Sequence, residues 1–185
     1  MAGGLKVAAS VGDTTLTSAI ASPKVFSYSQ VDVSAGTLSI AVAVDGTTLS
    51  STSWTATAGS DVTVLVSGTS ASDATVTIIT DDNRLPTSST KYKMRLMHAS
   101  AALADDSLTL TVDLTDIVSN QTFCTASSYV NRAYSSSSTI SVSSLENGTI
   151  FSLTEQSLVA QGVYDVIILD KSAGGQTYYL SNIRA

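Results

Sequence analysis

Residues 108–114, Leu-Thr-Leu-Thr-Val-Asp-Leu, decide the fold class of this chain. Apolar residues alternate there with threonine or aspartate, the pattern of a β-strand with one buried and one exposed face. The same alternation or a short apolar run recurs at residues 38–44, 62–66, 91–98, 140–142, 166–169 and 178–180. No stretch shows a sustained helical period with caps; the least clear is 116–126, where a short helical turn would fit. The sequence therefore predicts an all-β protein.

The spacing of turn signals predicts sandwich domains. They separate the strands at intervals of about 8–12 residues, which is typical of β-sandwiches and barrels. Residues 81–90 are polar, contain one of the two prolines and separate strong strand patterns, so they mark the best domain boundary. We predict two β-sandwich domains joined by a linker, over residues 1–83, 84–90 and 91–185.

The two halves share an order of features, at an offset of about a hundred residues. In each half an aromatic motif precedes an alternating strand, a hairpin turn and an apolar strand that follows a glycine. The matching pairs are 26–28 with 127–129, 38–42 with 140–142, Asp45-Gly46 with Asn147-Gly148, and 59–66 with 162–169. Aspartate, asparagine and glycine tolerate positive φ, as hairpin turns require. The order predicts a duplicated domain.

Composition excludes several classes of partner. The chain is 43% hydrophobic and 13% charged, which is enough apolar material for a core and too little charge for a disordered chain. Its net charge of −6, with nine Lys and Arg in total, argues against nucleic-acid binding. No stretch approaches the roughly 20 apolar residues that a membrane-spanning helix needs. Cys124 is the only cysteine, so no intrachain disulfide is expected.

Residues 80–100 resemble a known family. Residues 80–83 (Thr-Asp-Asp-Asn), Pro86 and residues 94–100 (Met-Arg-Leu-Met-His-Ala-Ser) resemble the acidic linker, opening strand and His-Ala-Ser motif of bacterial DUF4397 domains. Ser-Ser-Tyr at 127–129 and Phe-Ser-Tyr at 26–28 are similar to the mid-domain motif of that family. The resemblance implies tandem, immunoglobulin-like antiparallel sandwiches in a secreted or surface-anchored bacterial setting. It implies no activity and no catalytic residue.

The chain departs from the family pattern in two places. After His98, Ala99 and Ser100, the usual proline and aspartate are replaced by Ala-Ala-Leu at 101–103. The first repeat also lacks a counterpart of the strand at 91–98, which should precede Leu5. Either that domain is cut short or another chain supplies the strand.

Lys91, Lys93 and Arg95 place three of the nine cationic residues on one face of a strand. The simplest interpretation is an exposed strand face or a protected sheet edge, since lysine discourages pairing between sheets. The alternative is a docking stripe for an acidic partner, such as a second copy of this acidic protein.

His98 is the only histidine, and its alternation with Tyr92, Met94 and Leu96 predicts a hydrogen-bonded residue at the edge of the core. A Ser–His–Asp triad would lack the Gly-x-Ser-x-Gly elbow of hydrolases. One histidine and one cysteine are too few for a zinc site. We therefore expect no enzyme, no catalytic residue, no cofactor and no metal centre.

Tyr28 and Tyr129 occupy equivalent places in the two repeats, and we expect them to be core tyrosines with hydroxyls bonded to the backbone. Several aspartates offer the oxygen ligands that calcium prefers, but turn chemistry explains them more simply, since none has helix–loop–helix spacing. These aspartates are Asp81, Asp82, Asp105, Asp106, Asp113 and Asp116.

The function that follows is a non-catalytic structural or adhesive module, secreted or held at a bacterial cell surface. One alternative is a subunit of a self-assembling surface filament, in which a strand from a neighbouring subunit completes the first domain through an open strand edge. Another is a carbohydrate- or calcium-binding module. Trp54 is the obvious platform for a sugar, although a core or domain-edge position is more typical.

Overall fold

The computed structural model describes residues 5–32, 36–49, 52–55, 57–171 and 173–183. Strands dominate these residues, and the helical structure among them is one short 3₁₀ turn, η1 (Ala101–Leu103). The all-β prediction is therefore confirmed. This helical turn lies outside the stretch 116–126, which forms two strands and the turn between them rather than a helical turn.

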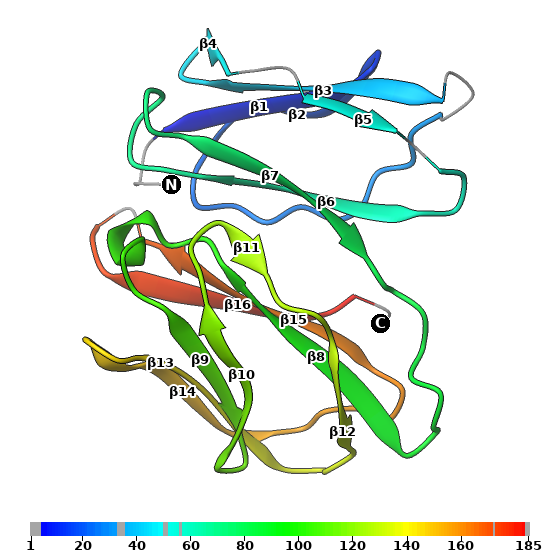
Figure 1. The fold of residues 1–185 in the computed structure, drawn as a ribbon, viewed down its shortest axis with the longest axis vertical. Coiled ribbons are helices and arrows are strands. Elements are labelled where there is room, and N and C mark those ends of the chain that lie inside the picture. Colours follow the sequence, from blue (N-terminus) through cyan, green and yellow to red (C-terminus); the bar gives the residue numbers. More distant parts are fainter. Residues whose placement is uncertain (1–4, 33–35, 50–51, 56, 172, 184–185) are drawn as a thin grey trace.

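The strands of residues 6–81 form two sheets, stacked in the upper part of Figure 1. One has the order β2-β1-β3-β4, with β5 also pairing with β3, and the other contains β6 and β7. All these pairs are antiparallel. The strands are β1 (Lys6–Val11), β2 (Thr14–Ala21), β3 (Thr37–Val44), β4 (Thr47–Thr48), β5 (Thr52–Thr55), β6 (Asp61–Ser67) and β7 (Thr75–Asp81). We call this unit the first domain.

The strands of residues 91–182 form two further sheets, the second domain, in the lower part of Figure 1. One sheet has the order β10-β9-β13-β14; in the other, β8 lies between β15 on one side and β11 and β12 on the other, and β16 follows β15. The strands are β8 (Lys91–His98), β9 (Leu108–Val112), β10 (Thr115–Gln121), β11 (Thr125–Ala126), β12 (Val130–Ala133), β13 (Ser138–Ser144), β14 (Gly148–Gln156), β15 (Val163–Asp170) and β16 (Gln176–Asn182).

One pair departs from the antiparallel expectation, because β8 and β15 run parallel. Alternation of side chains reports only which face of a strand is buried, and it is the same in parallel and antiparallel pairs. The direction of β8 is set by the chain, which reaches β8 and β15 from the same end of the sheet. This pairing places β8 in the interior of its sheet.

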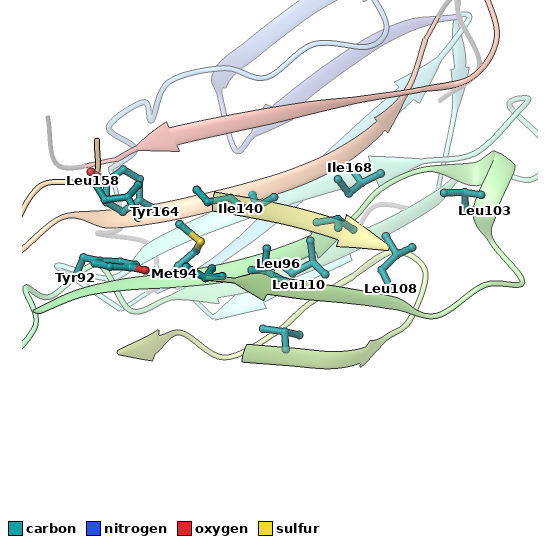
Figure 2. Packing of buried hydrophobic residues seen from close by; sticks show 14 residues of the cluster. Tyr92, Met94, Leu96, Leu103, Leu108, Leu110, Ile140, Leu158, Tyr164 and Ile168 are labelled. Atoms are coloured by element: carbon teal, nitrogen blue, oxygen red, sulfur yellow. The ribbon is translucent and has the colours of Figure 1, made fainter. Parts of the chain in front are cut away.

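The core of the second domain lies between its two sheets (Figure 2). The alternating residues of β8, β9, β13 and β15 meet there, and Leu96, Leu108, Val142 and Val166 are all 0% exposed. Each such side chain contributes roughly 1.5–3 kcal/mol when fully buried. The first domain has a core of the same kind around Ile40, Val42 and Val44, built from β1 and β3.

The strand pairing repeats between the two domains. Ile40 of β3 is opposite Val11 of β1, and Ile140 of β13 is opposite Val112 of β9. In both ladders the pairing continues from this pair, residue by residue, without a register shift. The ladder of β6 and β7 repeats in β15 and β16 in the same way, since Val64 is opposite Ile78 and Val166 is opposite Leu180. By these pairings β1, β3 and β6 have counterparts in β9, β13 and β15. We use the word counterpart in this sense below.

The hairpin turns follow the expected chemistry with one exception. Asp45 and Gly46 both have positive φ, at 48° and 78°, as a tight hairpin turn requires. Gly148 also has positive φ, directly after the turn that joins β13 to β14. Leu114, which continued the apolar alternation, is instead 97% exposed with φ of 63°. The chain must reverse after Val112, so Asp113 and Leu114 form the turn.

Candidate functional site: the domain junction and the open edge of β6

The outer face of the β6–β7 sheet lies against the outer face of the β8–β15 sheet (Figure 1). We call this contact the domain junction. Half of it is apolar: Leu65 of the first domain packs with Met97, Cys124 and Ile167 of the second. The hydroxyl of Ser67, 0% exposed, donates a 2.6 Å hydrogen bond to the carbonyl of Ala99 across the junction.

The other half of the junction is built around Arg95, whose side chain is 2% exposed. Its Nε donates to Asp165 Oδ1 at 2.7 Å and its Nη2 to Asp165 Oδ2 at 3.1 Å, a bidentate pair within the second domain. Nη2 also lies 2.7 Å from Oδ1 of Asp81, which comes from the first domain. Burial disfavours the charge of Arg95, but the carboxylates outweigh it, and the net effect raises the pKa of Arg95.

The two motif tyrosines converge on this pair of carboxylates. Tyr129 donates to Asp165 at 2.8 Å, and Tyr28 donates to Asp81 at 2.7 Å, beside the hydroxyl of Thr63. Burial, followed by the charge of Asp165, raises the pKa of Tyr129. Burial is also the largest cause that raises the pKa of Tyr28 to about 12. The prediction of core tyrosines bonded to backbone is therefore wrong, because both hydroxyls serve the junction.

The cationic strand is where sequence reasoning fails most clearly. Lys93 is 3% exposed, and its Nζ donates to the carbonyl of Asp82 at 2.6 Å and lies 3.2 Å from its Oδ2. The Tyr129 ring is 4.7 Å from Lys93 Nζ and 4.5 Å from the Arg95 guanidinium carbon. An exposed face, or a stripe that docks an external partner, is wrong for Lys93 and Arg95, because the first domain covers them. Lys91 alone is exposed.

The His-Ala-Ser motif joins the end of β8 to η1. His98 is 0% exposed, and its Nε2 lies 3.0 Å from the carbonyl oxygen of Leu103. Burial lowers the pKa of His98, opposed by that hydrogen bond. The hydroxyl of Ser100 donates to Asp170, and the backbone N–H of Ala101 donates to the same carboxylate at 2.8 Å. These hydrogen bonds fix the backbone between the end of β8 and η1.

Two comparisons with known proteins bear on this arrangement. Residues 2–105 match the model of the family described as Domain of unknown function (DUF4397). The chain belongs to this family. The match covers the first domain and continues through β8 and η1. No curated protein matches the chain.

Of the six aspartates considered above as calcium ligands, Asp81, Asp82 and Asp105 lie within the DUF4397 match. Where the structure records contacts, they are internal: Asp82 pairs with Arg84 at 2.7 Å, and Asp113 accepts from the backbone N–H of Thr139 at 2.8 Å. The side-chain hydrogen bond from Arg84 is the largest cause that lowers the pKa of Asp82 to about 2. In the described part of the chain, no three acidic, histidine or cysteine side chains gather as a metal would need. Calcium binding stays an untested alternative to turn chemistry.

Asp165 and Asp170 were missed in the sequence. Both lie in the apolar run of β15, and both are buried, at 5% exposure each. The available signal was a charged residue inside an otherwise apolar strand, since a buried carboxylate needs a partner. Arg95 of β8 is the partner of Asp165, whereas Asp170 accepts from Ser100 and Ala101.

The free edge of β6 completes the site. Within the described residues β6 pairs with β7 alone, whereas its counterpart β15 lies between β16 and β8. We call the unpaired side of β6 the open edge. Its backbone N–H and C=O groups are the kind that another strand can pair with.

No helix in the described ranges is long and apolar enough to cross a membrane.

The surface also has a shallow depression of about 160 Å³ beside β14 and β16. Phe151 and Tyr178 stack there, with ring centroids 4.6 Å apart and planes 19° apart. Trp54, the platform suggested by the sequence, lies elsewhere: it sits in β5 opposite Leu38 and packs against the first core.

Proposed function

We propose that this DUF4397 protein is a non-catalytic structural or adhesive module that works outside a bacterial cell. The observation that carries the proposal is the domain junction, in which Arg95 joins Asp81 of one domain to Asp165 of the other. A buried, charged and apolar contact of this kind favours a fixed angle between the domains. Two domains held at a fixed angle can bear load and keep a constant length, as a module of a cell-surface structure needs.

The use of the polar side chains supports the same proposal. The groups that hydrolytic or redox chemistry would need serve the fold here: His98 binds the carbonyl of η1, Cys124 packs in the junction, and Asp170 holds the chain at Ser100. Burial raises the pKa of Cys124, which disfavours the reactive thiolate. An adhesive role relies instead on exposed surface and its geometry.

Surface display tests the proposal. The chain is anchored on a non-adherent bacterial host, and retention of the cells on a biotic or abiotic surface is measured under flow. We expect higher retention than with the anchor alone. Arg95→Met, which loosens the junction, should reduce this gain, and Lys91→Met, which changes an exposed cation of the same strand, should leave it. Equal retention with and without the chain contradicts the proposal.

A second candidate is a subunit of a self-assembling surface filament, and the open edge of β6 is the observation that favours it. Strand addition to such an edge supplies backbone hydrogen bonds along the whole strand. Contacts between different surfaces of successive copies give filaments rather than closed rings. Electron microscopy of concentrated protein tests this candidate: filaments that vanish on blocking β6 support it, and dispersed particles at every concentration contradict it.

A further inference from the structure

The second domain shows how the sheet is completed beside a counterpart of β6. There β8 runs parallel to β15, with Val163 opposite Lys93 and Ile168 opposite His98. The backbone N–H of Lys93 donates to Gly162 at 3.0 Å, and that of Ala99 donates to Ile168 at 2.9 Å. Even-numbered residues of β15 therefore present their backbone groups to β8. The odd-numbered residues face β16, since Ile183 donates to the carbonyl of Val163 at 2.9 Å.

Among its described residues, the first domain has the flanking parts of this sheet but no strand at the central position. β6 pairs only with β7 among the described residues. The segment 23–31 forms no strand, although the equivalent stretch of the second domain supplies β11 and β12, both paired with β8. A strand between β6 and this segment would give both of them a partner. We call this position the strand slot.

Burial of the flanking residues follows the same pattern. Val166 and Ile168, the inward residues of β15, are each 0% exposed. Their counterparts in β6, Val64 and Val66, pack against the first core but are only partly buried. The buried residues of β6 are Leu65 and Ser67, which face the second domain. In the described residues, Val64 and Val66 therefore lack the neighbouring strand that β8 provides beside Val166 and Ile168.

The electrostatics favour a cationic occupant. In the second domain two cations of β8 lie over the ring of Tyr129. Tyr28 has the equivalent place in the first domain, and it is 47% exposed. A strand in the slot would bring its outer side chains over this ring, where a cation is attracted by the aromatic face. The net charge of −6 also attracts a basic segment.

We propose that the strand slot of the first domain binds an extended strand that runs parallel to β6 and has the side-chain pattern of β8, with apolar and cationic residues in alternation. Apolar side chains at alternate positions face the first core beside Val64 and Val66. Cationic side chains on the other face lie over Tyr28. The inference rests on the open edge that favours the filament candidate, and it does not require that filaments form.

A peptide of residues 90–100, Thr-Lys-Tyr-Lys-Met-Arg-Leu-Met-His-Ala-Ser, tests the proposal on the full chain. Trp54, the only tryptophan, packs against the first core and reports on that domain. With peptide at a hundred times its dissociation constant, the midpoint of the thermal transition seen by Trp54 should rise by roughly 10 °C or more. Hydrogen exchange of β6 should slow while that of β15 stays unchanged.

The matched variants change Val62. Its counterpart in β15 is the even-numbered Tyr164, and even-numbered residues of β15 present their backbone groups to β8, so the backbone N–H of Val62 should point into the strand slot. Val62→Pro removes this donor, and proline is tolerated where an edge strand has no partner. Val62→Ala keeps the donor. We expect Val62→Ala to bind the peptide and Val62→Pro to lose the shift. A peptide of the same composition without the alternation should give no shift.

Several outcomes overturn the proposal: no shift with wild type or Val62→Ala, an equal shift with Val62→Pro, or an equal shift with the reordered peptide. A dimer in the absence of peptide that Val62→Pro dissociates would show that a second copy covers β6 by edge-to-edge pairing, which also overturns it. Peptide binding without filaments in the microscope would remove the filament candidate alone and leave the strand slot established.

Discussion

Replacement of Arg95 by methionine should destabilise the protein more than any other single change to a cation. The guanidinium is 2% exposed, and the side chains of its two partners, Asp81 and Asp165, are 0% and 7% exposed. Methionine keeps much of the volume and removes all the hydrogen bonds. Two carboxylates then remain buried without a cation.

The size of the effect follows from that burial. Removing one member of a buried ion pair costs about 3–5 kcal/mol, because the remaining charge is left without compensation. We expect a loss of free energy of unfolding in that range for Arg95→Met. The triple variant that also carries Asp81→Asn and Asp165→Asn should recover about half of it, since the amides are neutral and still accept from the tyrosines. Lys91→Met, on the same strand but exposed, should change stability by less than about 0.5 kcal/mol.

Urea unfolding followed by circular dichroism and by Trp54 fluorescence measures these differences. The slope of the transition should be compared between variants as well, because it changes when unfolding is no longer two-state. If the junction opens before the domains unfold, circular dichroism and Trp54 fluorescence will report different transitions. A loss below about 1 kcal/mol for Arg95→Met would contradict the reasoning. So would a triple variant that is less stable than Arg95→Met.

Three further results are expected. As the pH falls below about 6.5, the free energy of unfolding should fall, because the pKa of His98 is lowered in the folded protein and the unfolded chain therefore binds the proton first. Urea midpoints measure this, and His98→Asn should flatten the dependence of the midpoint on pH. Cys124, 3% exposed, should react slowly with a thiol reagent in the native protein and faster in Arg95→Met; equal rates would contradict an opening of the junction. Tyr28 should ionise near pH 12, so stability is full below about pH 10 and is lost as the pH rises toward 12; an absorbance titration that Tyr28→Phe leaves unchanged would contradict this assignment.

The alternation of side chains predicted the all-β fold and most of the strands. It works where one face of a strand meets a core, as at Leu108, Leu110 and Val112, each buried to 1% exposure or less. It fails at Leu114, because alternation carries no information about where the chain turns back. There the neighbouring Asp113, which accepts from Ser138 and Thr139, decides the turn.

The candidate site was only half visible in the sequence. Lys93 and Arg95 alternate with apolar residues as exposed cations would, but a second domain covers the face on which they lie. Alternation distinguishes the two faces of a strand and cannot say what covers each. The charges themselves were the better guide, because Arg95 and Asp165 are opposite each other on adjacent strands, and a buried charge requires a partner.

The junction also limits how such domains can be multiplied. It joins corresponding surfaces: Leu65 and Ile167, which are counterparts, both lie in it, and each domain contributes one motif tyrosine. Each of the two domains uses this face in the junction, so neither has a face of that kind left for a third domain. A longer array would have to be built from such pairs, with a different contact between one pair and the next.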